Sequence, residues 1–206
     1  MKTIAIVSRK GGAGKTTLAL HLAVVAQIKG KEVAIIDLDP QASAAGWGDS
    51  RTQESPAVVS AQAARLPKVL QTASDAGADL AIIDTAPHSE TAALAAIRGA
   101  DLILIPCRPA ILDLRAISDT IDLVNLAKKT ATVVLNAVPS RGSLADEAIE
   151  AIGDYGVSVA PYRIGQRAAF IHSLTAGLTA SEYEPKGKAA KEIQQLYKWT
   201  CKQLKM

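Results

Sequence analysis

The stretch that decides the fold is Thr3-Ile-Ala-Ile-Val-Ser-Arg-Lys-Gly-Gly-Ala-Gly-Lys-Thr-Thr17. An apolar run comes before the glycines, and the helix-like segment Leu18–Ala26 follows them. Strand, glycine loop and helix in this order form a phosphate-binding loop. Glycines let successive backbone N–H groups turn toward a phosphate chain, and the helix N-terminus adds the positive end of its dipole. The stretch therefore predicts a site for a nucleoside triphosphate.

Within this loop, each residue type has an expected task. Lys15 can reach the β- and γ-phosphate oxygens, and the Thr16 hydroxyl can ligate Mg²⁺. The residues expected to bind the nucleotide are Gly11, Gly12, Ala13, Gly14, Lys15, Thr16 and Thr17. The strict P-loop pattern has a glycine five residues before Gly14, where this chain has Arg9. The loop is therefore a variant with a second lysine, Lys10, on its leading edge.

The rest of the chain alternates apolar runs with helix-like segments. Strands are expected at 3–7, 32–37, 79–83, 101–105, 131–136 and 157–160. Helices are expected at 16–29, 61–76, 90–98, 114–128, 143–154, 166–176 and 187–204, and a surface loop at 49–56. Continuous apolar runs are typical of strands buried on both faces. We expect an α/β fold with one doubly wound, mostly parallel sheet, helices on both faces, and the nucleotide at the carboxyl ends of the strands.

Composition limits the class of protein. The 206 residues, 49% of them hydrophobic, suit a single domain spanning 1–206. No apolar run is long enough to span a bilayer, and the N-terminus enters an expected core strand rather than a signal peptide, so a cytoplasmic protein is expected. Cys107 and Cys201 have no metal-ligand spacing. Because the net charge is only +3, any affinity for nucleic acid must come from local clusters of lysines.

Acidic residues at two strand ends are candidates for metal and water chemistry. Asp84 ends an apolar run, where a P-loop protein normally holds the Mg²⁺ shell opposite Thr16; a cap for a turn or helix is the alternative. Asp37 and Asp39 lie two residues apart and should project to the same side. One of them could position the attacking water while the other orients the metal shell. The expected metal residues are Thr16, Asp84 and Asp37.

Asn136 and Pro161 are candidates for contact with the base. Asn136 ends an expected strand, and its amide can donate to and accept from an adenine edge, although asparagine at this place is equally typical of a turn. Pro161 begins a segment that could supply backbone contacts to the base.

The C-terminal segment is the most basic part of the chain. Ala189, Ile193, Leu196 and Leu204 recur at helical spacing, which predicts an amphipathic helix at about 187–204. The candidates for contact with DNA phosphates are Lys186, Lys188, Lys191, Lys198, Lys202 and Lys205, with Arg163 and Arg167 possible neighbours. The alternative is a docked terminal helix with a solvated face.

Four blocks of sequence resemble the ParA/MinD family of deviant-Walker ATPases. They are Lys10–Thr17, Val33–Gln41, Leu80–Pro87, and Leu102–Pro106 followed by Pro109 and Leu112-Asp113-Leu114. The resemblance implies ATP and Mg²⁺ as cofactors and an ATP-bound sandwich dimer, in which Lys10 reaches the partner subunit's phosphates. It also assigns Asp39 to the activation of water and Asn136 to recognition of the base. The expected catalytic residues are Lys10, Lys15, Asp39 and Asp37.

Within this resemblance, the sequence favours a small ParA-type partition ATPase. Such a protein binds nonspecific DNA as an ATP-bound dimer on the nucleoid and is released when a centromere-bound ParB-type protein stimulates hydrolysis. We expect no N-terminal helix-turn-helix domain and no membrane binding. The alternatives are a MinD-like membrane ATPase and a ligase or metallocluster protein of the same fold. The second is disfavoured by the Asp-Pro-Gln after Leu38 and by the lack of a second cysteine beside Cys107.

Overall fold

The computed structural model describes residues 1–206 and contains a seven-stranded sheet in the order β3-β2-β4-β1-β5-β6-β7, with every neighbouring pair parallel. The strands are β1 Lys2–Ile6, β2 Val33–Asp37, β3 Ala57–Ser60, β4 Leu80–Asp84, β5 Leu102–Cys107, β6 Thr132–Leu135 and β7 Ser158–Val159. In β2 and β4 every residue is buried, as the continuous apolar runs predict. The predicted parallel α/β fold is confirmed.

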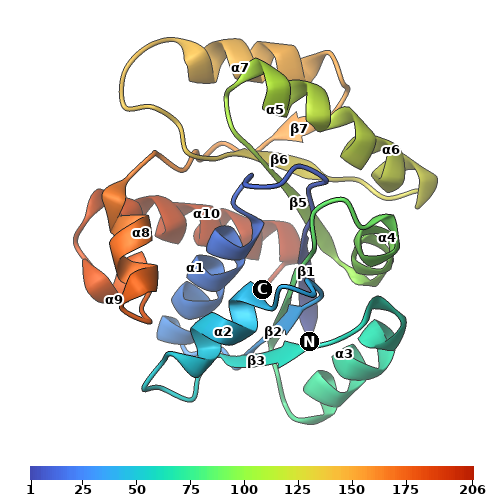
Figure 1. Ribbon diagram of the computed structural model, residues 1–206, viewed down its shortest axis with the longest axis vertical. Helices are drawn as coiled ribbons and strands as arrows, with labels where there is room; N and C mark the ends of the chain where they lie inside the picture. The colour runs from blue at the N-terminus through green and yellow to red at the C-terminus, as the bar shows by residue number, and fades with distance from the viewer.

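Helices cover both faces of this sheet (Figure 1). One face carries α1 Lys15–Ile28, α2 Ser43–Asp49, α8 Ala168–Thr175, α9 Ala180–Tyr183 and α10 Lys188–Leu204. The other face carries α3 Leu66–Asp75, α4 Glu90–Gly99, α5 Ile111–Ala116, α6 Ser118–Leu126 and α7 Leu144–Gly153. Each face has its own apolar core, of 27 and 26 buried residues respectively.

Three details differ from the expected elements. The edge strand β3 lies between the expected loop and the expected helix 61–76, which begins as a short 3₁₀ turn, Ala63–Arg65. The helix expected at 114–128 is two helices, α5 and α6. Neither α2 nor α9 was expected, and α2 contains Gly46 and Gly48, which have low helix propensity.

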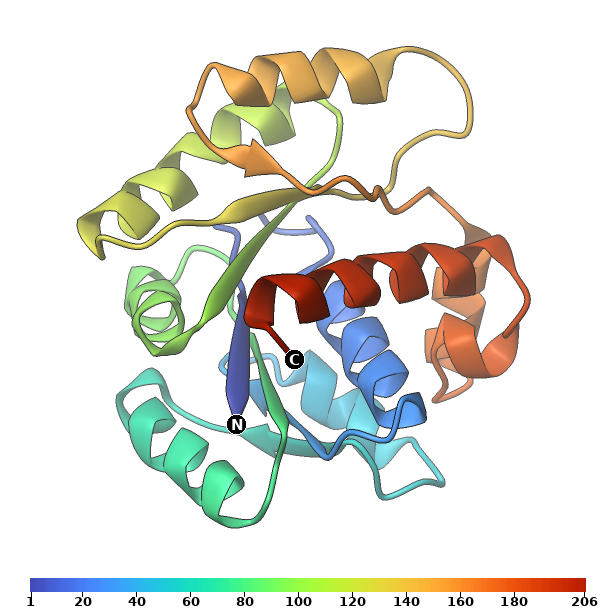
Figure 2. The same ribbon diagram turned by 180° about the vertical axis from the view of Figure 1, so that it is seen from behind.

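The C-terminal helix α10 crosses the sheet beside α1 (Figure 2). Its buried residues are Ala189, Ala190, Ile193, Leu196, Tyr197, Thr200 and Leu204. They include the apolar positions from which the helix was predicted, so this face of α10 is part of the core. None of the helices combines the length and the apolar content that crossing a membrane requires.

Candidate nucleotide-binding site

The pairing register of the strands brings the predicted acids to the P-loop. In the parallel ladder Ile6 pairs with Asp84, and Asp84 also pairs with Asp37 of β2. The three residues therefore end neighbouring strands in one row. The P-loop leaves β1 at this row, so all the groups expected to bind phosphate and metal lie at one edge of the sheet.

The loop itself needs its glycines. Gly12 and Gly14 have φ angles of 73° and 94°, which side chains rarely adopt. A Cβ on Gly14 would also clash with Nδ2 of Asn136. Helix α1 begins directly after Gly14 with no side-chain cap and no acidic residue in its first turn. Its first N–H groups are therefore free to bind an anion.

Lys15 is held inside the loop. It is buried, and its Nζ donates a hydrogen bond to the carbonyl oxygen of Lys10 at 3.2 Å. Burial lowers the pKa of Lys15, while the negative charges of Asp84 and Asp39 oppose this shift. A buried ammonium with one carbonyl acceptor still has donors for phosphate oxygens.

Asp84 is the clearest sign of a cation site. Its side chain is fully buried, and neither carboxylate oxygen has a hydrogen-bond partner. Burial raises the pKa of Asp84 to about 7, although the nearby Thr16 hydroxyl and the Lys15 charge act in the opposite direction. Thr16 lies close to this carboxylate without making a well-formed hydrogen bond to it. Two free oxygens beside a hydroxyl are the ligand type that Mg²⁺ prefers, so these residues fit the ion.

Asp37 is engaged with the backbone. One carboxylate oxygen accepts from the N–H of Asp39 at 2.9 Å, and the other accepts from Ala44 and Ala45 at 2.9 and 3.1 Å. This arrangement anchors the first turn of α2 and the loop that carries Asp39. A metal contact would have to share an oxygen with these N–H groups, so Asp37 as a metal ligand stays a prediction.

Asp39 lies half-buried in the loop after β2, and one of its oxygens accepts from the N–H of Gln41 at 2.9 Å. Asp37 and Asp39 both line a cleft of 830 Å³. Because β2 ends at Asp37, the projection of both carboxylates to one side stays a prediction. The negative charge of Asp39 acts to raise the pKa of Lys15, so Asp39 lies within electrostatic reach of the phosphate loop. Its second oxygen is free to orient a water molecule.

The two candidate base contacts have different surroundings. The Asn136 amide donates to the carbonyl oxygen of Ala13 at 2.8 Å, so this side chain lies against the P-loop and its oxygen remains free. Pro161 is exposed, and no hydrogen bond joins it to the P-loop or to Asn136. Recognition of the base by either residue stays a prediction.

Two basic residues of the loop, Arg9 and Lys10, differ in their contacts. Arg9 forms an ion pair with Asp119 at 3.6 Å, and its N–H donates to the Thr120 hydroxyl. It therefore ties the loop to α6. The Lys10 side chain is half-buried and has no ion pair, which leaves its charge available.

Arg108 lies beside the P-loop and is not among the residues that the sequence pattern singles out. It follows β5 and is exposed, and its Nη2 atom lies 3.7 Å from the position of a Cβ on Gly12. Its place follows from the fold, because β5 extends two residues beyond the strand expected at 101–105 and the residue after β5 lies at the carboxyl edge of the sheet.

The six candidate lysines of the C-terminal segment are all exposed, and none forms an ion pair. At 100° per residue, Lys188, Lys191, Lys198 and Lys202 fall within about 80° of the helix circumference. This strip lies opposite the buried face of α10. Arg167 is bonded to Glu192 of α10, whereas Arg163 pairs with Asp146 at 3.5 Å. The strip is thus a surface of uncompensated positive charge.

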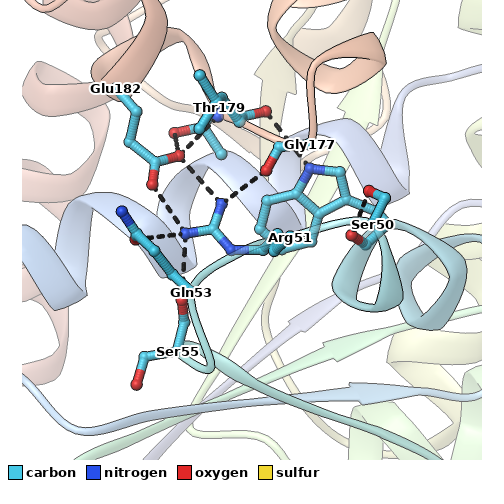
Figure 3. A network of polar contacts seen from close by, with 9 residues as sticks. Ser50, Arg51, Gln53, Ser55, Gly177, Thr179 and Glu182 are labelled. Carbon is cyan, nitrogen blue, oxygen red and sulfur yellow. Dashed lines mark hydrogen bonds and ion pairs between the residues drawn. The ribbon is translucent and has the colours of Figure 1, made fainter.

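A network around Arg51 fixes the far end of α2 (Figure 3). The buried guanidinium bonds both oxygens of Glu182, at 2.8 and 3.1 Å, and the Gly177 carbonyl at 3.0 Å. It also lies 4.5 Å from the centre of the Trp47 ring. Helix α2 is therefore anchored by Asp37 at one end and by Arg51 at the other.

Comparison with known proteins agrees with this geometry. Residues 4–179 match the family described as the CobQ/CobB/MinD/ParA nucleotide binding domain. The chain is 30% identical to the maintenance of carboxysome distribution protein A of Gloeobacter kilaueensis over 98% of its own length and 94% of that protein. It is 34% identical to the chromosome partitioning protein ParA of Caulobacter vibrioides, over 54% of this chain and 49% of that protein.

Among solved structures, the fold is similar to the septum site-determining protein MinD of Pyrococcus horikoshii, which is complexed with Mg-ADP. The TM-score is 0.76 at 20% identity, over 97% of this chain and 95% of that one. ATP and Mg²⁺ are the cofactors that the P-loop, Lys15 and the free oxygens of Asp84 fit. The chain belongs to the CobQ/CobB/MinD/ParA nucleotide-binding family, as its resemblance to the ParA and MinD ATPases predicts.

Proposed function

We propose that this chain is a Mg²⁺-dependent ATPase whose ATP-bound dimer binds DNA without sequence preference, and that it positions or segregates a cargo. The observation that carries the proposal is the strip of unpaired lysines on α10, opposite a face that is packed into the core. Lysines without interleaved aromatic residues suit contact with phosphates rather than with bases.

In the proposed reaction, Lys15 and the α1 N-terminus hold the phosphate chain, and Thr16 and Asp84 are the residues that would hold Mg²⁺. The metal ion, when bound, neutralises charge on the phosphate oxygens. Asp39 orients the attacking water, and Asp37 keeps the Asp39 loop in place through its backbone bonds. Lys10 contributes its charge to the partner subunit's phosphates, which makes hydrolysis depend on dimerisation.

We infer that the cargo is a plasmid or chromosome bound by a ParB-type partner, and that the protein is nucleoid-associated. Support comes from the relative named for chromosome partitioning. The relative named for carboxysome distribution offers a second kind of cargo, because it matches along almost the whole chain. Deleting the gene and scoring both plasmid retention and the fraction of cells without a chromosome tests the first cargo; no change in either would favour the second.

A MinD-like membrane role is the competing mechanism. It would require an apolar helix face free to enter lipid, and the apolar face of α10 is buried. Co-sedimentation with random duplex DNA and with anionic vesicles, each with ATP, ADP or no nucleotide, separates the two mechanisms. We expect sedimentation with DNA only when ATP is present; sedimentation with vesicles instead would overturn the proposal.

Two lysine variants test the coupling between ATP and DNA. Lys15→Ala should lose nucleotide binding and every later step. Lys10→Ala should bind ATP normally but lose the ATP-dependent dimer and, with it, DNA binding. Normal dimers and normal hydrolysis in Lys10→Ala would remove the deviant-Walker mechanism from this proposal.

A further inference from the structure

Arg108 lies at the mouth of the phosphate loop in the same chain. It directly follows β5, which pairs with β1, the strand that leads into the loop. Its guanidinium reaches back over Gly12, with Nη2 at 3.7 Å from the position of a Cβ there. Gly11 and Gly12 are themselves exposed, so this side of the loop is open.

The backbone beneath Arg108 is fixed. Its carbonyl oxygen accepts from the N–H of Ala110 at 2.8 Å and from the Cys107 thiol at 3.3 Å. The carbonyl of Cys107 in turn accepts from the N–H of Asn136 at 2.8 Å, and Pro109 is buried. Because this backbone is held by hydrogen bonds, the Arg108 side chain can adopt fewer conformations than a side chain on a mobile loop.

The charge of Arg108 is uncompensated. Arg9, Arg51, Arg163 and Arg167 each have a carboxylate partner within 4 Å, and Arg108 has none. No hydrogen bond uses its guanidinium. An arginine fork with free donors matches phosphate oxygens in shape as well as in charge.

We propose that the Arg108 guanidinium binds the phosphate chain of the nucleotide in the P-loop of its own subunit, as a second cation beside Lys15. A nucleoside di- or triphosphate carries more negative charge than one lysine neutralises, and Lys10 is assigned to the partner subunit. Arg108 therefore supplies a cation before any dimer exists. The proposal rests on nucleotide binding at this loop, but not on DNA binding or on the identity of the cargo.

The test is a titration with fluorescent Mg-ADP, a ligand that is not hydrolysed further. Arg108→Ala should raise the Kd about tenfold, as expected for the loss of a hydrogen bond to a charged group. The Kd of Arg108→Lys should lie between those of Arg108→Ala and the parent, because lysine keeps the positive charge but lacks the forked donors of the guanidinium. The matched control is Arg98→Ala, which removes an exposed, unpaired arginine from the last turn of α4. It should change the Kd by less than about twofold.

A second measurement guards against misfolding. Because the Arg108 side chain is exposed and unbonded, Arg108→Ala should melt at the parental temperature without ligand, and saturating Mg-ADP should raise that temperature less than in the parent. A Kd within twofold of the parent, or an equal effect of Arg98→Ala, would overturn the assignment. A parent that fails to bind Mg-ADP, or a Lys15→Ala variant that binds it normally, would instead overturn the nucleotide site itself.

Discussion

Asp84 and Asp37, which pair with each other at the ends of β4 and β2, have opposite surroundings. Asp84 is buried with both oxygens free, and Asp37 is buried with both oxygens bonded to backbone N–H groups. The sequence predicts both positions, because each ends an apolar run. It could not predict the difference, which arises because α2 turns its first N–H groups toward Asp37, whereas no backbone N–H group bonds Asp84.

Asp39 provides the residue-level test of hydrolysis. Asp39→Ala should bind ATP like the parent and lower the hydrolysis rate by a factor of about 100 or more, because a water-positioning carboxylate contributes at least this much. The matched control is Asp49→Ala, an exposed and unpaired aspartate at the end of α2. Phosphate release at saturating ATP measures the rate. Parental turnover in Asp39→Ala would move the role to another residue.

His21 provides a residue-level test of pH dependence. Its Nδ1 bonds the Thr17 carbonyl at 2.7 Å, and its Nε2 is buried without a partner. Burial lowers the pKa of His21 to about 4, whereas the Thr17 carbonyl and Glu182 act to raise it. In the unfolded chain the pKa is about 6.5. The neutral form therefore stabilises the fold fully above about pH 6.5, and this contribution is lost as the pH falls toward 4.

We therefore expect His21→Gln to become less destabilising, relative to the parent, as the pH falls from 7 to 4. The difference in unfolding free energy should change by roughly 3 kcal/mol over this range. Urea unfolding of both proteins at several pH values measures it, and the carboxylates common to both cancel in the comparison. A difference that stays constant with pH would show that His21 does not titrate in this way.

At the scale of elements, α2 is held by its two ends rather than by its own sequence. Two glycines in seven residues give it a low helix propensity, and its N-cap, Ala42, offers no side-chain bond. The Asp37 carboxylate replaces that cap, and Arg51 binds the far end to Glu182. Helix α2 was not predicted because neither its glycines nor Ala42 indicates a helix, and the anchor at its far end joins Arg51 to Glu182, 131 residues apart.

Breaking the contact between Arg51 and Glu182 should destabilise the fold. The Arg51 side chain is 1% exposed and that of Glu182 is 14% exposed. Burial by itself would raise the pKa of Glu182, but the hydrogen bonds from Arg51 and Thr179 outweigh it and lower that pKa. Arg51→Ala leaves this carboxylate without its main partner and should cost about 3–5 kcal/mol.

The matched control is Arg163→Ala, which breaks an exposed pair with Asp146 and should cost less than about 1 kcal/mol. Urea unfolding midpoints measure both variants. Equal midpoints for Arg51→Ala and Arg163→Ala would mean that the buried pair does not anchor α2.

At the scale of the whole molecule, the features that the sequence could predict depend on local patterns, and those that it could not predict depend on contacts between distant segments. The P-loop, the central strands and α10 were predicted because each depends on a motif or periodicity within one segment. The ion pair of Arg9 with Asp119 joins segments 110 residues apart, and no local pattern predicts it. The position of Arg108 after β5 places it at the carboxyl edge of the sheet, but its contact with Gly12 depends on the fold. The exposed lysines of α10 are a consequence of its packing, because burying the apolar face turns the strip outward.

The lysine strip should therefore control the salt dependence of DNA binding. Each phosphate neutralised contributes about 0.9 to the slope of log affinity against log salt. If Lys191, Lys198 and Lys202 contact phosphates in both subunits of the proposed dimer, replacing all three by alanine should lower the slope by about 5. Affinity should fall equally for all sequences, while ATP affinity stays unchanged.

A charge-matched control separates contact from net charge. Lys2, Lys29 and Lys68 are exposed and lie outside α10. Their replacement by alanine removes the same charge from the protein. Because these lysines are not proposed to contact DNA, the slope at moderate salt should stay nearly unchanged. Both triple variants should unfold at the parental midpoint, because the buried face of α10 keeps Ile193, Leu196 and Leu204. If the α10 variant keeps the parental affinity and slope, or if the control loses as much, the DNA surface is not the lysine strip, and α10 serves only to close the core over α1.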